Sequence, residues 1–288
     1  MGTATSHVPP GIRQVFRYSV TDSSPASTRT PHRGLPSTTL TLVFATDAPL
    51  LCSYDQCEWA SGEGVTHNVC LGAFHLQPVY LHRPDRQEGV QVAVHPLAAR
   101  QLLGLPAAAL TELTQEGEDA IGVEMRHLFA RVASASPADH SDLVADGLRG
   151  LADRNANRSG PRREVAGAWL LLERSGGRMG ITDVADQVGL TTRHLSTLVK
   201  AELGIGTKQL ADLFRFEAAH HSVVSAVDAG NPLRLADIAH AHGYADHAHM
   251  DQAYRRYTGT SPTGWLSDEG RRSAGTDRSG GDASLVEQ

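Results

Sequence analysis

The side chains best suited to chemistry in the first half of the chain are histidines and cysteines. They are widely spaced: His67, His75, His82, His95, Cys52, Cys57 and Cys70. A metal site usually shows ligands at short, defined intervals, and the cysteines do not follow the paired Cys-x-x-Cys zinc pattern. We therefore expect no metal and no cofactor, with hydrogen-bonded histidines and buried, reduced thiols. A metal site, or a redox-sensing Cys52 or Cys57, is the alternative.

Catalytic motifs are missing from the sequence. It contains no Gly-x-Ser-x-Gly nucleophile turn, no Walker loop and no Rossmann glycine set. We expect no catalytic residue. The rival class is a cupin-like metalloenzyme with an appended helical module, which needs two histidines and one carboxylate that the N-terminal half does not bring together in sequence.

The composition is that of a two-domain globular protein. The chain has 288 residues, 40% of them hydrophobic and 20% charged, and a formal net charge of −6. No apolar run is long enough to cross a bilayer, and no secretory signal is evident, so we expect a cytoplasmic protein without a membrane partner. The negative charge argues against nucleic-acid binding through bulk charge, but not through a local basic face.

The residue pattern divides the chain into five parts. Strand-like segments such as Thr39 to Phe44, Val65 to Phe74 and Val90 to Val94 come before helical spacing, which begins near Pro96 and continues to Trp265. Ser-, Pro- and Gly-rich stretches favour disorder at both ends, with the whole head expected to be structureless to about Pro36 and the tail from Asp268. The expected parts are a disordered head (1–30), an α+β domain (31–152), a polar linker (153–161), an all-α domain (162–267) and a disordered tail (268–288).

The all-α part contains a helix-turn-helix pattern from Thr182 to Leu203. Thr182 can cap a short helix, Gly189 suits the left-handed backbone of a tight turn, and Thr191 can cap a second helix. Leu195, Val199 and other apolar residues form the buried face of that helix, which leaves polar and mildly basic residues outside.

A second copy of the pattern spans Leu235 to Tyr257. Ala239 and Gly243 repeat the spacing of the first copy, Asp246 can cap the following helix, and that helix is expected to end at Gly259. One such corner is common in helical bundles, whereas two copies joined by an amphipathic stretch, Thr207 to Val227, are far more specific.

The two copies resemble the AraC/XylS family of transcription regulators over about Glu164 to Leu266. The matching pieces are Val184-Ala185-x-x-Val188-Gly189-Leu190-Thr191-x-Arg193-x-Leu195, and Gly243-Tyr244-x-Asp246 with its continuation through His249-Met250 and Tyr254-Arg255-Arg256 to Gly259-x-Ser261-Pro262. The resemblance implies two recognition helices joined by one long helix, each reading a major-groove segment of double-stranded DNA.

The resemblance also implies roles for individual residues. Contacts to base edges would come from Arg193, Ser196, Thr197, His247, His249 and Gln252, and contacts to phosphates from Thr192, Lys200, Arg255 and Arg256. His240, His242, His247 and His249 could instead chelate a metal, but DNA-facing or solvated side chains are favoured. Acidic and basic residues balance between Pro161 and Arg272, so we expect weak binding by a monomer.

The N-terminal half resembles, more loosely, the small β-barrel or cupin-like sensor of some of these regulators. This resemblance implies a small-molecule effector of unknown identity, a homodimer, and RNA polymerase as a further partner. Activation is the expected mode, although the residues do not distinguish it from repression. The apolar stripe of Asp119 to Ala133, which includes Met125 and Phe129, is the expected dimer contact; the alternative is that this face packs on the barrel of its own chain.

Overall fold

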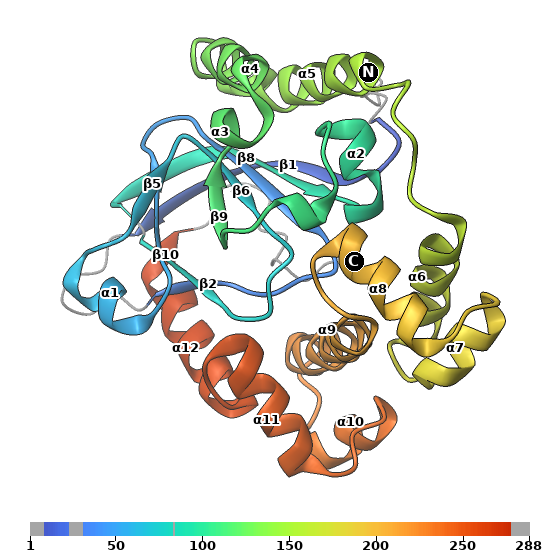
Figure 1. Cartoon of the computed structure of the whole chain (residues 1–288). Coiled ribbons are helices and arrows are strands. Elements are labelled where there is room, and N and C mark those ends of the chain that lie inside the picture. Colours follow the sequence, from blue (N-terminus) through green and yellow to red (C-terminus); the bar gives the residue numbers. More distant parts are fainter. Residues whose placement is uncertain (1–8, 23–30, 83, 278–288) are drawn as a thin grey trace, which may run out of the picture.

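The computed structural model describes residues 9–22, 31–82 and 84–277. The first half contains two antiparallel β-sheets with helices around them, and the second half is helical (Figure 1). This arrangement confirms the expected α+β domain followed by an all-α domain. In the described ranges, no helix is both long and apolar enough to cross a membrane.

The larger sheet has the strand order β10-β1-β8-β3-β6-β9, and the smaller sheet has the order β2-β7-β4-β5. The strands are β1 (Ile12–Asp22), β2 (His32–Gly34), β3 (Leu40–Ala45), β4 (Leu50–Ser53), β5 (Val65–His67), β6 (Val69–Gly72), β7 (Val79–Leu81), β8 (Arg86–Val94), β9 (Thr114–Glu116) and β10 (Thr276–Asp277). In β3 and β8, alternate residues such as Leu40, Leu42, Val90 and Val92 are fully buried, because successive side chains of a strand point to opposite faces.

The head of the chain is ordered where the structure describes it, so the expected disorder up to Pro36 is wrong. β1 is an eleven-residue strand that pairs along its length with β8, and β2 pairs with β7. The polar composition misled the prediction, because β1 gains its hydrogen bonds from β8 and packs only part of its apolar side chains on the core. Residues 1–8 and 23–30 lie outside the described ranges.

Helices surround the sheets on two sides. They are α1 (Gln56–Ser61), α2 (Ala99–Leu102), α3 (Gly117–Ile121), α4 (Val123–Ala133), α5 (His140–Arg154), α6 (Arg163–Ser175), α7 (Ile181–Gln187), α8 (Thr192–Leu203), α9 (Thr207–Asp228), α10 (Leu235–Ala241), α11 (His247–Thr258) and α12 (Pro262–Gly275). Figure 1 shows α4 and α5 along the top of the sheets and α6 to α12 to the right and below.

The apolar stripe expected at a dimer contact packs inside the chain instead. Met125, Leu128 and Val132 of α4 are buried in the main core. Gly147 of α5 lies so close to Leu128 that an added Cβ would overlap the leucine side chain. Because α4 and α5 approach each other at this glycine, the stripe is used within the domain and is not available to a second chain.

The C-terminal end also differs from the sequence prediction. The tail expected to be disordered from Asp268 begins as part of α12, which continues to Gly275, and Thr276 and Asp277 pair with β1. The chain therefore returns to the first sheet at its end. The expected linker begins inside α5, which runs to Arg154, and the next helix, α6, starts at Arg163. Residues 278–288 are outside the described part.

A single apolar core joins the two halves. It extends from Leu40 and Val92 in the sheets to Leu195 and Tyr254 in the helical half. At the junction, the Trp169 ring lies 4.8 Å from the His95 ring and 5.0 Å from the Phe214 ring. The packing of these rings fixes the helical domain against the sheet domain.

Candidate nucleic-acid interface

The first helix-turn-helix unit consists of α7, the turn around Gly189, and α8. Gly189 has a φ of +73°, a conformation that favours glycine. The Thr191 side chain accepts a hydrogen bond from the His194 amide and caps α8, as predicted. The predicted cap at Thr182 is wrong: α7 begins one residue earlier, and its N-cap is Gly180, which provides no side-chain bond.

The outer face of α8 carries the predicted recognition residues. Thr192, Arg193, Thr197 and Lys200 are exposed, and Ser196 is half-buried. The Thr197 hydroxyl donates to the Arg193 carbonyl at 3.0 Å, so it is held against its own helix. Within the described ranges, Arg193 and Lys200 form no ion pair, and their charges are available to a partner.

The second unit consists of α10, the turn around Gly243, and α11. Gly243 has a φ of +75°, and the Asp246 carboxylate accepts from the His249 amide at 2.8 Å, so both predicted roles are confirmed. Helix α11 ends at Gly259, as predicted. Its buried residues Met250 and Tyr254 occupy the same helical positions as Leu195 and Val199 of α8, which gives the two helices the same orientation of buried and exposed faces.

The exposed face of α11 is more engaged than that of α8. The His247 Nε2 lies 3.2 Å from a carboxylate oxygen of Asp251, and Arg255 reaches the other oxygen at 3.4 Å. His249 Nδ1 accepts from the Ala245 amide, and its ring packs edge-on against Tyr244. Gln252 is exposed. His247, His249 and Arg255, three of the predicted DNA contacts of α11, therefore already contact neighbours in their own helix or turn.

A long helix, α9, connects the units and supports the second one. His220 of α9 is buried, its Nδ1 lies 3.0 Å from the Tyr254 hydroxyl, and its ring stacks on Phe216. Burial lowers the pKa of His220 to about 4, with a smaller effect from His221. A neutral imidazole thus links α9 to α11.

The N-terminal domain holds the first unit through a charged contact that sequence reasoning missed. Arg100 of α2 donates from Nε and Nη2 to the two carboxylate oxygens of Glu202 on α8, at 2.8 and 3.0 Å. These hydrogen bonds raise the pKa of Arg100. Glu202 lies on the buried, otherwise apolar face of α8. Because a buried carboxylate needs a charged or hydrogen-bonding partner, its position in the sequence could have predicted such a contact.

A second charged contact was also missed. Glu217 of α9 accepts from the Thr38 amide and hydroxyl at 2.8 and 2.6 Å and from the Ser37 hydroxyl at 2.8 Å. Burial raises the pKa of Glu217, and the hydrogen bonds from Thr38 and Ser37 oppose that rise. The loop before β3 is thereby fastened to the helix between the two units.

The C-terminal ends of both recognition helices abut the N-terminal domain. A Cβ added to Gly204, which follows α8, would lie 3.5 Å from the Ala108 Cα. A Cβ added to Gly259, which follows α11, would lie 2.9 Å from the Tyr80 hydroxyl. Both glycines have positive φ, so a side chain at either cap is strained, and at Gly259 it would also press on the Tyr80 hydroxyl.

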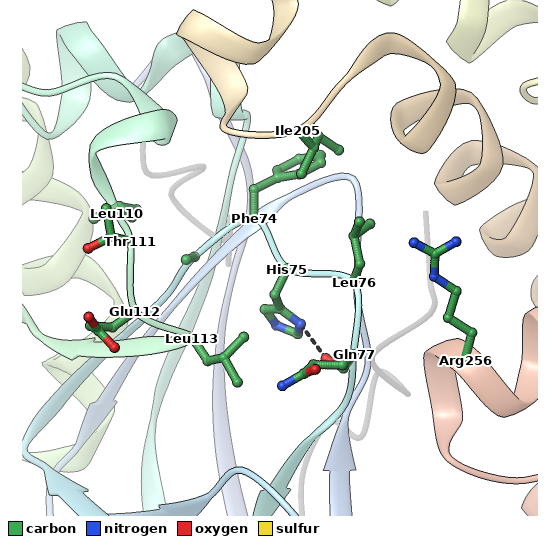
Figure 2. Close-up of a pocket in the computed structure, with 11 residues that line it drawn as sticks. Phe74, His75, Leu76, Gln77, Leu110, Thr111, Glu112, Leu113, Ile205 and Arg256 are labelled. Atoms are coloured by element: carbon green, nitrogen blue, oxygen red, sulfur yellow. Dashed lines mark hydrogen bonds between the residues drawn. The ribbon is translucent and has the colours of Figure 1, made fainter.

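A pocket of about 510 Å³ opens between the sheet domain and the two units. It is lined by the segments Ala73 to Gln77 and Leu110 to Leu113, by Ile205 beside α8 and by Arg256 of α11. In Figure 2, the Arg256 side chain stands at the side of the pocket opposite Leu113 and Glu112. The phosphate contact expected of Arg256 stays a prediction. In the structure, Arg256 lines the pocket.

Three of the histidines considered as metal ligands in the sequence have hydrogen-bonding neighbours. His75 Nδ1 lies 2.6 Å from the Gln77 carbonyl, His82 Nε2 lies 2.7 Å from the Ser53 hydroxyl, and His95 Nδ1 accepts from the Leu97 amide. Burial lowers the pKa of His95 to about 4, assisted by Arg13. His67 Nε2 lies 2.9 Å from the Thr114 hydroxyl.

A family model described as a helix-turn-helix domain matches residues 184–268. The matched region holds both units and their shared helix, with the turn glycines and caps described above. It is an AraC-type helix-turn-helix domain. The C-terminal half of the chain is thus the DNA-binding domain of a transcription regulator, as the sequence motifs predict. No curated protein shows significant sequence similarity to the chain.

Three solved structures are similar to this chain. An apo variant of ToxT from Vibrio cholerae strain SCE256 is 10% identical, with a TM-score of 0.50 over 90% of this chain and 98% of that one. Another ToxT structure is 13% identical over 88% and 98% of the chains, with a TM-score of 0.48. The C-terminal domain of AraT, a response regulator from Geobacillus stearothermophilus, is 24% identical over 37% and 85%, with a TM-score of 0.33. The first of these likenesses extends the shared fold to the N-terminal sheets.

Proposed function

We propose that the chain is a cytoplasmic, sequence-specific regulator that binds double-stranded DNA through both units and responds to a small molecule held by its N-terminal domain. The observation that carries this proposal is that α8 and α11 bury matching helical positions, which leaves a polar face exposed on each of the two helices. Recognition helices presented in this way enter successive major-groove segments of one duplex.

The charge balance favours binding as a homodimer. A domain with as many acidic as basic residues gains little affinity from counterion release, so one chain alone binds DNA weakly. Two chains on adjacent half-sites add their binding free energies, and twofold symmetry is the commonest way to build such a pair. Because the α4 stripe is buried within the chain, the dimer needs another surface.

The pocket between the domains is the proposed effector site. Its lining residues belong to the sheet domain, to the residue after the C-cap of α8 and to α11, so a bound molecule touches the elements that orient both recognition helices. A ligand shifts such an equilibrium only by its differential affinity for two states. The two glycine caps and the Arg100–Glu202 pair are the contacts through which that difference reaches the DNA-binding faces.

Genome-wide footprinting of the full-length protein tests DNA recognition. We expect a small set of sites with a shared motif, and tighter binding to that motif than to scrambled duplex at every salt concentration. Binding that does not distinguish the motif from scrambled DNA would contradict the proposal. Genes next to the footprints then give the compounds to assay as effectors.

Substitution at the domain contact tests coupling. Arg100→Gln removes the charged partner of Glu202 and should reduce the effector-dependent change in operator affinity at least fivefold, because the sheet domain no longer holds α8. Arg126→Gln, which breaks an exposed ion pair remote from the DNA-binding domain, is the control. An unchanged effector response in Arg100→Gln would show that the signal takes another route.

A further inference from the structure

Three soft or nitrogen ligands meet in the interior of the sheet domain. Cys52 of β4, His67 of β5 and Cys70 of β6 are all buried, and one ligand atom from each lies within 4.8 Å of the other two. The two sulfur atoms are 4.0 Å apart. β4 and β5 belong to the smaller sheet and β6 to the larger one, so the cluster lies where the two sheets face each other.

The His67 imidazole has one ring nitrogen in a hydrogen bond and one without a partner in the described part of the chain. Its Nε2 lies 2.9 Å from the Thr114 hydroxyl, whereas its buried Nδ1 has no hydrogen-bond partner within the described ranges. The nearest carboxylate oxygen, from Glu116, is 3.9 Å from Nδ1, which is too far for a hydrogen bond. When Nε2 carries the proton and donates it to Thr114, the Nδ1 lone pair is free, and metal-bound histidines typically use their second nitrogen in this way.

The sulfur separation agrees with a shared ion. A cation with bonds of about 2.3 Å to two sulfurs in trigonal geometry separates those sulfurs by about 4.0 Å. Apolar side chains, including Val43, Leu50 and Val79, form the cluster around the cysteines. Such surroundings provide no further ligand from solvent and favour a small coordination number with the three protein ligands.

The ligand atoms of the two cysteines and the histidine determine which ions can bind. Thiolate sulfur and imidazole nitrogen prefer soft or borderline cations, whereas calcium and magnesium require oxygen ligands. We propose that Cys52, Cys70 and His67 form a buried site for one thiophilic closed-shell cation, either Zn(II) or Cu(I). Each thiol releases its proton to the buffer as its sulfur bonds to the metal, and no electron is transferred.

This site does not depend on the proposed DNA-binding function. It lies on strands of the sheet domain, none of its three residues lines the pocket between the domains, and they take no part in the contacts to α8 or α11. Its loading can therefore be measured on the full-length protein without DNA and without an effector.

The test is metal binding by the reduced, full-length protein. Chelator-treated protein in a phosphine reductant is titrated with Zn(II), and separately with Cu(I) under nitrogen, each against a chromophoric competitor. We expect one equivalent of one of these ions to bind tightly and to raise the melting temperature. If the wild-type protein bound neither Zn(II) nor Cu(I) tightly, the proposal would be overturned.

Cysteine variants assign the ligands. Cys52→Ala and Cys70→Ala should each lower affinity at least a hundredfold and abolish the metal-dependent rise in melting temperature. Cys57→Ala removes the exposed cysteine on α1 and is the matched control, which should bind as the wild type does. Loss of binding in Cys57→Ala together with retention in Cys70→Ala would overturn the assignment.

A measurement on the wild type covers the case in which a buried variant fails to fold. X-ray absorption at the metal edge should show two sulfur ligands and one nitrogen ligand in the first coordination shell. A shell with fewer than two sulfurs would overturn the proposal, whatever the behaviour of the variants.

Discussion

The two helix-turn-helix units have the same framework and different attachments. Each has a turn glycine with positive φ, a side-chain N-cap on its second helix and a glycine C-cap. At matching positions, however, Arg193 of α8 corresponds to Ala248 of α11, and Glu202, which is paired with Arg100, corresponds to Tyr257 in an aromatic cluster.

These differences concern two properties of each unit: the side chains free to contact DNA and the contacts that attach the unit to the rest of the chain. α8 combines exposed Arg193 and Lys200, which are free to contact DNA, with a charged connection to the sheet domain. α11 has its polar face occupied by the Asp251 contacts, and its attachment rests on His220 and Tyr254. We infer that the first unit supplies most direct base recognition and receives the signal, whereas the second mainly adds affinity.

The largest expected effect concerns acid stability of the second unit. The pKa of His220 is lowered from 6.5 to about 4 in the folded chain. Between pH 6.5 and pH 4, the histidine is therefore protonated in the unfolded chain and neutral in the folded chain. The stabilisation is complete above pH 6.5 and is lost as the pH falls toward 4, by roughly 3 kcal/mol for this one group. His220→Phe should therefore lose less stability than the wild type over that interval, as measured by denaturant unfolding at a series of pH values.

The controls for this experiment come from both units. His240→Phe, at an exposed position on α10, should leave the pH dependence of the free energy of unfolding as it is in the wild type. The first unit has Val199 in place of Tyr254 and needs no such histidine. Parallel pH profiles for the wild type and His220→Phe would refute the role of the buried imidazole.

The next effect concerns base recognition by the first unit. Arg193→Ala makes α8 resemble α11 at the matching position and should cost about 1–3 kcal/mol at one base pair, because a bidentate contact to guanine is lost. Competition binding with single-base variants of the operator should show relaxed preference at that position alone. If Arg193→Ala weakened specific and random DNA equally, its assigned role would be wrong, and Lys200→Ala supplies that uniform pattern for comparison.

The smallest effect should sharpen the contrast at α11. Asp251→Asn releases Arg255 and His247 from the carboxylate, an exposed interaction worth about 0.3–0.5 kcal/mol. We expect operator affinity to rise about two- to threefold, with a steeper dependence on salt as Arg255 turns to phosphate. Asp228→Asn, at the end of α9, changes the net charge equally and is the control; an equal gain in that variant would contradict the specific role of Asp251.

Local rules predicted the DNA-binding half well. Gly189 and Gly243 stand at left-handed turns, and Thr191 and Asp246 cap the helices, because these features depend on the chemistry of a few adjacent residues. Thr182 shows the limit of such rules, since Gly180 begins the helix and the threonine lies in its first turn.

Contacts between distant residues could not be predicted in this way. β1 depends on pairing with β8, and the cluster of Cys52, His67 and Cys70 forms only when three strands meet. The α4 stripe was expected at a dimer contact but packs within the chain, because the sequence does not say that Gly147 brings α5 against it. The proposed roles of the DNA-facing residues still await experiment.

The packing of Trp169 between the two domains limits how the domains can be exchanged by recombination. Its indole is packed by His95 and Phe74 from one domain and by Phe214 from the other. Recombination within residues 155–162 would give the helical half a new sensor but leave this large ring facing water. A successful chimera must therefore include an N-terminal domain with a complementary apolar surface, so the two domains of this protein are inherited together more readily than they are exchanged.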